Sequence, residues 1–305
     1  MTNRAELPYR LAVIGVGNMG GAMARRLLRL GWALNVCDLV PDRVRALQDL
    51  GARACANPAE AARDAAVSIV AVVDTPQCQA VLFGANGLTQ DTAPGHVVLI
   101  CPTLAPADVA SMAQALQGGG IAVIEAPMSG GPQRAEDGSM SLILSGRDEL
   151  LAEHTPLLEA LAGHRHHISE TIGDAAKTKL VNNLAAAIFL LGTAEVLALA
   201  QAMGLDPSAT LAVMEQSSGQ SWIGSDRMRR QLSGDLAPRA HLSLLTKDAR
   251  LALEAAERTG FQGPLGGLTR DVFAKACALG LTDRDDGVLF KWLSGTLEPN
   301  PSDPT

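Results

Sequence analysis

Short apolar runs alternate with stretches of helical periodicity along the first half of the chain. These runs are expected to be buried strands because they are short, apolar and bounded by turn residues. They are RLAVIGV (10–16), ALNVCD (33–38), VSIVAVV (67–73), HVVLIC (96–101), IAVIEAP (121–127) and SMSLILSG (139–146). Helices are expected at 20–30 and 41–50, and Ala-rich helical segments separate most later runs. This alternation is typical of an α/β domain with a mostly parallel sheet covered by helices.

The pattern changes near Ile172. From there almost to the C-terminus the apolar positions recur with helical spacing, and no strand-like alternation occurs. A continuous helix is expected from 175 to 203, because no proline interrupts it and Gly192 is its only glycine. Gly204 is a typical stop signal. The expected organisation is a sheet domain (1–170), an all-helical domain joined to it by the long helix (171–297), and a Pro-rich, disordered tail (298–305).

Composition narrows the class of protein. With 305 residues and 47% hydrophobic content, the chain is long enough for two domains with sizeable cores. Its net charge of -7 is spread along the chain, whereas nucleic acids and membrane surfaces attract concentrated basic patches. The apolar runs are too short, or too often interrupted by Gly, Pro or charge, for a membrane span. We expect a small-molecule ligand and no nucleic-acid or membrane partner.

The five cysteines are odd in number and widely spaced, so neither a disulfide framework nor a zinc site is predicted. A reduced, cytoplasmic setting fits this usage best. The His-rich segment GHRHHISE (163–170) is expected to be a solvated strand or loop end, and no metal site is expected there. DRMRR (226–230) is expected to be a solvated helix face. Trp222, Phe290 and Trp292 are expected to fill the helical core or a subunit interface.

VIGVGNMGGAMARRLL contains the pattern G-x-G-x-x-G at Gly15, Gly17 and Gly20. The pattern follows an expected strand and opens an expected helix, which is the context that a dinucleotide-binding turn requires. Gly15 permits the sharp turn, Gly17 lets backbone amides approach a pyrophosphate, and Gly20 lets the helix pack closely on the strand. The alternative is an ordinary strand-to-helix turn in a Gly-rich protein. We interpret the motif as the dinucleotide cradle of a Rossmann-type, doubly wound domain.

Asp38 ends the second expected strand, where a carboxylate can bind the ribose hydroxyls of the adenosine. The same carboxylate would repel the 2′-phosphate of NADP, and Leu39 and Val40 offer no positive charge. Arg43 and Arg45 lie a few residues further on and keep NADP as an alternative. NAD is therefore the expected cofactor, with NADP less favoured.

A second glycine-rich stretch, EAPMSGG, begins at Glu125. Pro127 sets the approach to a tight turn formed by Ser129, Gly130 and Gly131. A hydroxyl and successive backbone amides in such a turn can hold the carboxylate of a small acid. A plain β-turn before a hairpin fits the local sequence equally well.

The third motif, IGDAAKTKLVNN (172–183), contains the first lysines of the chain beside two asparagines. Each residue of a helix advances by about 100°, so Lys179 and Asn183 share a face while Lys177 points nearly the opposite way. A lysine can move the proton at an alcohol or carbonyl oxygen while an amide orients the substrate. Partial burial between two domains would lower the pKa of such a lysine. The alternative is that both lysines are solvated and the asparagines pack between helices.

Together these motifs resemble the β-hydroxyacid dehydrogenase family, which includes 3-hydroxyisobutyrate dehydrogenase, tartronate semialdehyde reductase and L-threonate dehydrogenase. The resemblance covers the chain to about Trp292. The family's cradle, G-x-G-x-M-G-x-x-M, is matched by Gly15, Gly17, Met19, Gly20 and Met23. Its D-A-P-V-S-G-G loop resembles EAPMSGG, and its G-x-G-x-x-x-K-x-x-N-N segment resembles residues 173–183. Its Ser-Thr-x-x-Pro stretch is similar to PTLAP (102–106).

The chain departs from the family pattern at a few positions. Glu125 replaces the usual Asp, and Ala175 replaces the second glycine before the lysine, which could shift the start of the helix. Pro102 replaces a serine, and Val73 replaces a frequent proline. None of these changes removes a reacting group.

The resemblance implies a role for each matched residue. Lys179 would be the catalytic lysine, and the substrate would contact Ser129, Gly130, Gly131 and Asn183. The cofactor would contact the cradle residues Gly15, Val16, Gly17, Asn18, Met19 and Gly20, together with Asp38, Val73, Asp74, Thr103 and Lys247.

The resulting hypothesis is an NAD-dependent oxidoreductase that moves a hydride between the nicotinamide and a small β-hydroxy acid or its semialdehyde or keto form. The resemblance also implies a homodimer or homotetramer. Two alternatives remain open: a related reductase acting on imines or sugar phosphates, and a catalytically inactive nucleotide-binding module.

Overall fold

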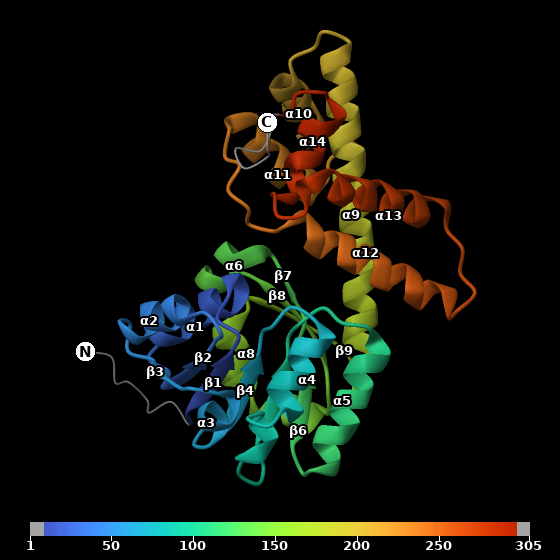
Figure 1. Cartoon of the computed structure of the whole chain (residues 1–305). Coiled ribbons are helices and arrows are strands. Elements are labelled where there is room, and N and C mark those ends of the chain that lie inside the picture. Colours follow the sequence, from blue (N-terminus) through green and yellow to red (C-terminus); the bar gives the residue numbers. More distant parts are fainter. Residues whose placement is uncertain (1–8, 298–305) are drawn as a thin grey trace. The chain divides into compact units, whose positions relative to one another are not determined.

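The computed structural model describes residues 9–297 (Figure 1). The chain divides into two compact units, Met1–Lys179 (unit 1) and Leu180–Thr305 (unit 2). The division falls within helix α9 (Asp174–Ala202), so this helix contributes residues to both units. The expected tail, 298–305, lies outside the described residues.

Unit 1 is built on a sheet with the strand order β3-β2-β1-β4-β5-β6-β8-β7, in which β9 pairs with β8. The strands are β1 (Leu11–Ile14), β2 (Leu34–Cys37), β3 (Arg53–Ala54), β4 (Val67–Val70), β5 (Val97–Ile100), β6 (Ala122–Glu125), β7 (Met128–Ser129), β8 (Ser141–Ser145) and β9 (His164–Ser169). The pairs from β3 through β6 are parallel, whereas β8 runs antiparallel to β6 and β7. The direction of winding reverses at β1, the kind of switch point where open α/β sheets bind ligands. The predicted doubly wound, mostly parallel sheet is confirmed.

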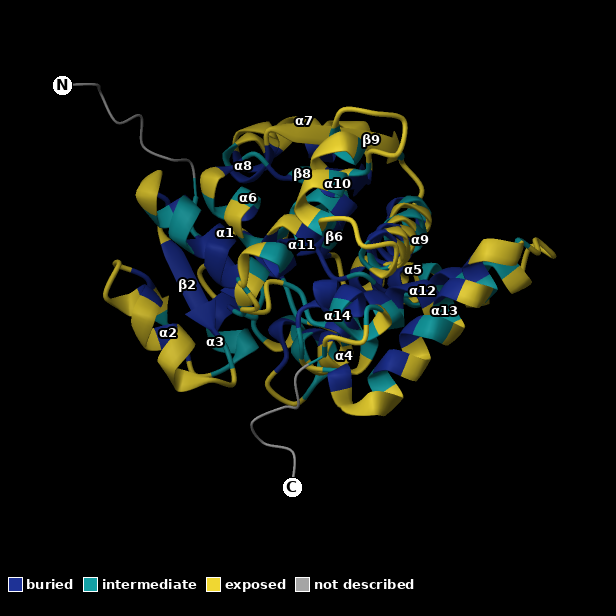
Figure 2. Ribbon diagram, turned by 90° about the horizontal axis from the view of Figure 1, so that it is seen from above, coloured by how far each residue is buried: buried dark blue, intermediate teal, exposed yellow. Residues whose placement is uncertain are grey.

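Helices cover both faces of this sheet. They are α1 (Asn18–Arg29), α2 (Pro41–Gln48), α3 (Pro58–Ala62), α4 (Thr75–Phe83), α5 (Pro106–Gly118), α6 (Gly131–Asp137), α7 (Asp148–Glu153) and α8 (Thr155–Leu161), with a 3₁₀ turn at Leu88–Gln90. In β1, Leu11 and Val13 join a core cluster with side chains of α1 and α8, while Ala12 and Ile14 join another with α4 and α5. Figure 2 shows β2 buried and much of α2 exposed. Burial on both faces explains why these strands are continuous apolar runs.

The apolar pattern did not predict β3, β7 or β9. The first two are only two residues long. β9 lies within the His-rich segment 163–170, and its residues 164–168 are exposed. Main-chain pairing with β8 forms this strand without an apolar face. The expected solvated strand end is therefore confirmed.

Unit 2 is helical, as the spacing of apolar residues predicts. Its helices beyond α9 are α10 (Pro207–Glu215), α11 (Trp222–Ser233), α12 (Leu242–Glu257), α13 (Pro264–Ala276) and α14 (Leu289–Leu293), with a π turn at Cys277–Leu281 and a 3₁₀ turn at Asp286–Val288. Leu190 and Leu197 of α9 pack with Phe273 of α13 in one core cluster. Phe290 is buried in this cluster and Trp292 packs against it, whereas Trp222 is 55% exposed and does not fill the core.

Helix α9 begins and ends within one residue of the predicted 175–203. By length and hydropathy alone it could cross a membrane, a property that the sequence interpretation assigned to no segment. Only 39% of its most apolar window is buried. Part of this apolar character serves the core of unit 2, because Ala187, Leu190, Ala194 and Leu197 are buried there.

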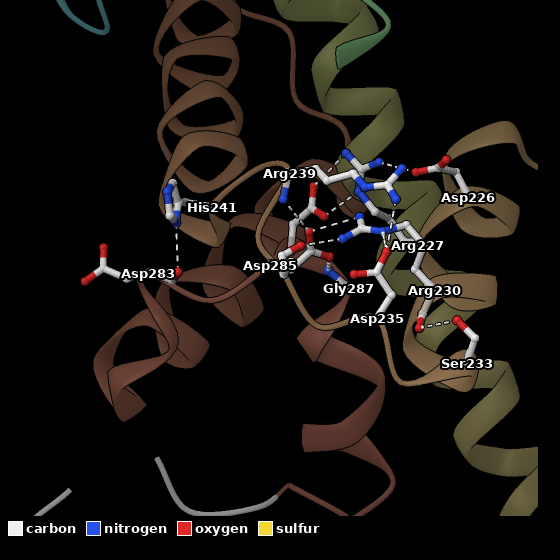
Figure 3. Close-up of polar contacts among 12 residues, drawn as sticks. Asp226, Arg227, Arg230, Ser233, Asp235, Arg239, His241, Asp283, Asp285 and Gly287 are labelled. Atoms are coloured by element: carbon white, nitrogen blue, oxygen red, sulfur yellow. Dashed lines mark hydrogen bonds and ion pairs between the residues drawn. The ribbon is translucent and has the colours of Figure 1, made fainter. Parts of the chain in front are cut away.

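The segment 226–230 is not a solvated face, so that expectation is wrong. Arg230 of α11 is buried, with its Nη1 3.1 Å from Asp285 Oδ2 and its Nε 3.2 Å from Asp235 Oδ2 (Figure 3). One helical turn earlier, Arg227 Nε lies 2.5 Å from Asp286 Oδ1. The two arginines share a face at i,i+3 spacing, and their partners are consecutive aspartates distant in sequence. Local polarity alone could not reveal these buried pairs.

Candidate active site

The glycine cradle is a sharp turn between β1 and α1 in unit 1. Gly15 adopts φ +86, and a Cβ there would lie 2.9 Å from the Ala71 carbonyl oxygen. A Cβ on Gly20 would lie 1.9 Å from the Gly15 carbonyl oxygen. Both distances are shorter than any real contact, so glycine is required at each position. The turn and the close helix–strand packing expected from the sequence are both present.

The N-terminal end of α1 is open to an anion. Its cap residue is Gly17, no side chain caps the first turn, and that turn contains no acidic residue. A Cβ on Gly17 would meet only Arg43 Nη1, at 3.7 Å. The first-turn residues Asn18 and Met19 therefore present backbone amides at the positive end of the helix dipole. This arrangement fits the pyrophosphate of a dinucleotide.

Asp38 directly follows β2, and its side chain binds the glycine cradle. Its Oδ2 accepts a hydrogen bond of 2.7 Å from the Val16 amide, and its Oδ1 accepts one of 2.8 Å from Val40. Arg43 Nη1 lies 3.7 Å from the same carboxylate. Arg45 instead forms an ion pair with a residue of its own helix. Of the two arginines that kept NADP as an alternative, only Arg43 lies beside Asp38.

A cleft of about 370 Å³ opens beside these residues. It is lined by Val16, Gly17, Asn18, Gly21, Arg25, Asp42, Arg43, Ala46 and Leu47. Its size lies at the lower end of the range for small-molecule pockets, which fits the adenosine end of a dinucleotide.

The loops after β4 and β5 lie at the same edge of the sheet as the cradle. In the strand register, Ile14 pairs with Val70, which in turn pairs with Ile100, so these three strands end level. Val73 is exposed in the first loop, and Asp74 caps α4 by accepting a 2.9 Å hydrogen bond from the Gln77 amide. Half-buried Thr103 lies in the second loop. Parallel strands thus bring the predicted cofactor loops of unit 1 to one edge.

The turn at Ser129, Gly130 and Gly131 leads directly into a helix rather than into a hairpin. Ser129 ends β7, and Gly131 begins α6. Gly130 and Gly131 adopt φ +125 and +77. Arg134 of α6 donates a 2.5 Å hydrogen bond to the Ser139 carbonyl and one of 3.3 Å to its hydroxyl. The turn is the tight structure that a small carboxylate would need, and its nearest cation is already engaged.

The two lysines at the start of α9 have opposite environments. The Lys177 side chain is 63% exposed and pairs with Asp174 at 2.7 Å, whereas Lys179 is only 6% exposed. The expected difference between them is confirmed. Asn183 lies one helical turn after Lys179 on the same face of α9.

In unit 2, Asn183 is held by Asp248, to which the sequence interpretation gave no role. Its Nδ2 donates a 2.5 Å hydrogen bond to Asp248 Oδ2 of α12, and its Oδ1 accepts one of 3.1 Å from Asn182. Lys247 Nζ lies 3.0 Å from the other oxygen of Asp248. Asp248 therefore joins the expected substrate amide to the expected cofactor lysine. Its position directly after Lys247 was the only signal in the sequence.

Two family models together match nearly the whole chain. Residues 10–173 match the NAD binding domain of 6-phosphogluconate dehydrogenase, and 173–293 match the NAD-binding domain of NADP-dependent 3-hydroxyisobutyrate dehydrogenase. The chain is 33% identical over 293 residues to an L-threonate dehydrogenase of Cupriavidus necator, covering 96% of this chain and 99% of that relative. The chain belongs to the β-hydroxyacid dehydrogenase family.

Other relatives agree with this family assignment. An NAD-dependent L-serine dehydrogenase of Pseudomonas aeruginosa is 32% identical, over 94% of this chain and 98% of that relative. The crystal structure of a 3-hydroxyisobutyrate dehydrogenase from Salmonella typhimurium has a TM-score of 0.87 at 30% identity, covering 93% of this chain and 99% of that one. The protein is therefore an oxidoreductase with a nicotinamide cofactor.

The departures from the family pattern are accommodated locally. Ala175 is buried in the first turn of α9, and its amide donates a 3.0 Å hydrogen bond to Ser145 Oγ. The helix begins at Asp174 despite the missing glycine. Glu125, in place of the family Asp, also contacts this turn.

Proposed function

We propose that the protein is a dehydrogenase of a small β-hydroxy acid, with Lys179 as its general acid and base. The supporting observation is a buried lysine with an amide one helical turn away, on a family scaffold whose cradle and anion turn are both formed. A lysine excluded from bulk water, with an oriented amide beside it, suits proton transfer at a substrate oxygen.

In the oxidation direction Lys179 takes the proton of the substrate hydroxyl, and in reduction it returns it. The nicotinamide, when bound, supplies the hydride acceptor or donor at its C4 atom. The turn at 129–131 holds the substrate carboxylate through its amides and the Ser129 hydroxyl. Asn183 orients the substrate oxygen, and Asp248 fixes the orientation of the amide.

The decisive test is Lys179→Ala. We expect kcat to fall about 10²–10⁴-fold, which is the typical contribution of general acid–base catalysis. Binding of the nicotinamide cofactor, measured by fluorescence titration, should be almost unchanged. Lys177→Ala is the matched control and should retain wild-type turnover, because its side chain points to solvent. A fully active Lys179→Ala enzyme would remove the lysine from the mechanism.

The substrate is proposed to be a small acid such as threonate, serine or hydroxyisobutyrate. The relatives carry the names of threonate and serine dehydrogenases, and SSGQSW (217–222) resembles the 3-hydroxyisobutyrate and threonate branches. A sugar phosphate is less favoured, since Arg134, the arginine beside Gly130, already directs its Nε and Nη2 to Ser139.

The cofactor is proposed to be NAD, because the Asp38 carboxylate lies beside the cradle and would repel a 2′-phosphate. A spectrophotometric screen of small β-hydroxy acids with NAD and NADP tests both proposals. The expected result is turnover of at least one such acid, with a higher kcat/KM for NAD. A strong preference for NADP would contradict the role given to Asp38 and point to Arg43.

We further propose a cytoplasmic enzyme that forms a homodimer or homotetramer. The cysteines within the described residues are free, and all but Cys277 are buried, which suits a reducing compartment. Self-association is supported by an apolar stripe that follows α9 and ends at Met203, directly after the helix. It is formed by the exposed residues Val181, Phe189, Gly192, Val196, Leu199 and Met203 and the partly exposed Ala185. These positions recur at intervals of three and four residues, so they follow one face of the helix.

A further inference from the structure

Glu125 connects the sheet of unit 1 to the start of α9. It is the last residue of β6 and lies opposite Ser145 of β8 in the strand register. Its side chain is almost fully buried, with the residue 1% exposed. The substrate turn begins at Ser129, only four residues later in the chain. Glu125 therefore belongs to the segment that leads into the substrate turn, and its side chain reaches the start of the helix that contains Lys179.

Two side chains of the sheet cap the first turn of α9. Glu125 Oε2 accepts a 2.7 Å hydrogen bond from the Gly173 amide, and its Oε1 accepts another of 2.7 Å from Ala176. Ser145 Oγ accepts from Ala175 at 3.0 Å. Two residues that face each other on paired strands thus bind three of the first backbone amides of this helix.

No amide at this helix end lacks an acceptor. The Asp174 amide donates to the Thr171 carbonyl at 3.2 Å, and the first intrahelical bond runs from Lys177 N to Gly173 O at 3.0 Å. A helix leaves its first four amides without internal partners, and Glu125 alone satisfies two of them here. Because this end is buried, water cannot easily replace the carboxylate. Loss of Glu125 should therefore displace the start of α9.

The start of α9 determines the position of Lys179, because Lys179 follows Ala176 by three residues and so lies about one helical turn later. We propose that Glu125 is a positioning residue for Lys179, whose carboxylate holds the first turn of α9 in register with the substrate turn. This inference rests on the proposed role of Lys179. A displacement of about 1 Å between reacting groups can lower turnover about 10²-fold, so a precise anchor matters for the rate.

The first turn of α9 needs two hydrogen-bond acceptors at this position, one for the Gly173 amide and one for the Ala176 amide. A polar side chain of the same size is not sufficient. Burial raises the pKa of Glu125, whereas the amides of Gly173, Ala176 and Ala175 act in the opposite direction by stabilising the carboxylate. The nearby charge is Asp174, which also raises this pKa and is itself paired with Lys177. A carboxamide of the same shape would turn an NH₂ group toward one of the amides, and that hydrogen bond would be lost.

The test compares Glu125→Gln, which keeps the shape, with Glu125→Asp, which keeps both acceptor oxygens but shortens the reach. Asn57→Ala is the matched control, because the Asn57 side chain caps α3 in the same unit by accepting from the Glu60 amide at 2.9 Å. The measurements are kcat, KM for NAD, the solvent isotope effect on kcat and the melting temperature of each variant.

For Glu125→Gln we expect kcat to fall about 10- to 100-fold, with KM for NAD unchanged and a larger solvent isotope effect, since a misplaced lysine slows proton transfer. Glu125→Asp should recover part of this loss. Asn57→Ala should lower the melting temperature while its kcat and isotope effect stay at wild-type values. A Glu125→Gln enzyme with wild-type kcat, or with a loss of kcat and no change in isotope effect, would overturn the inference.

The outcome is separable from that of the proposed function. If Lys179→Ala is inactive and Glu125→Gln behaves as wild type, only the positioning role is wrong. If Lys179→Ala is active, the proposed chemistry itself is wrong, whatever Glu125→Gln shows.

Discussion

The two units differ in what they expose and in how they bury charge. Among the described residues, six large apolar side chains are exposed in unit 1 and fourteen in unit 2. Unit 1 covers both faces of its sheet and buries neutral histidines such as His96. Unit 2 instead buries paired arginines and aspartates and leaves apolar helix faces open. The difference agrees with the proposed self-association, because the exposed apolar side chains are concentrated in unit 2.

The largest effect should come from breaking the buried charge pairs of unit 2. Asp285→Ala removes the buried partner of Arg230 and leaves it only Asp235, whose side chain is 37% exposed. Breaking a buried ion pair typically costs about 3–5 kcal/mol, and the remaining pair with Asp235 should keep the loss near the lower end of that range. Urea unfolding followed by circular dichroism would measure the change. Arg250→Ala, which removes a half-exposed pair with Glu254, is the control and should have little effect. Equal stability of the two variants would show that the buried pairs do not brace unit 2.

A second experiment tests whether the exposed apolar stripe of α9 is a contact between copies of this chain. Gly192 lies midway between Val181 and Met203, so an antiparallel pair of α9 helices would bring the two glycines together at a two-fold axis. Val196→Glu places a charge next to this point and should shift the protein toward the monomer. Size-exclusion chromatography with light scattering would measure the shift.

Leu30→Glu, at an exposed apolar position of unit 1, is the matched control for this experiment and should leave the assembly state unchanged. If Val196→Glu has the same mass as the wild type, the stripe is not the interface. The comparison between the units would then need another explanation.

The smallest effect concerns pH, and its sign differs between two buried histidines of unit 1 and Asp286 of unit 2. Burial lowers the pKa of His96 and His154 below the ordinary value of 6.5. Their contribution to stability is present above pH 6.5 and is lost as the pH falls through their folded-state values. Burial raises the pKa of Asp286 in unit 2 to about 6 from 3.8. That contribution is fully present below pH 3.8 and is lost as the pH rises through about 6.

As the pH falls from 7.5 to 5.5, the two histidines should therefore lower the stability of unit 1 while Asp286 raises that of unit 2. Hydrogen exchange in urea, resolved by mass spectrometry and corrected for intrinsic rates, would report each unit separately. His96→Gln can keep hydrogen bonds to Ala65 and Ser68 without titrating, and it should reduce the pH dependence of unit 1. A parallel change in both units would contradict the comparison.

Most of the fold could be predicted because the parallel strands are buried on both faces. An apolar run such as 67–73 contains enough information to identify a strand. For β9 the apolar pattern left strand and loop equally open, because the strand is held by main-chain bonds to β8 and has exposed side chains. The buried arginines of α11 were missed for the opposite reason: Arg227 and Arg230 look solvated until Asp285 and Asp286 fold against them.

The candidate site shows the same limit. Helical geometry distinguished Lys179 from Lys177, because a difference of two residues reverses the direction of a side chain. The same reasoning could not find Asp248 as the partner of Asn183, or Glu125 as the cap of α9. Each of these contacts joins residues that are far apart in the chain. The periodicity of a sequence indicates the direction of a side chain, but it does not indicate which distant residue that side chain contacts.

The continuous helix at the boundary between the units has a practical consequence for dissecting the protein. A chain ended at the boundary would make Lys179 its last residue, with the final carbonyls of α9 unpaired and its last turn frayed. Neither fragment would then contain both the lysine and the amide of Asn183. Chimaeras that exchange the helical unit between relatives should therefore be joined before Gly173, so that the whole of α9, with both Lys179 and Asn183, comes from one protein.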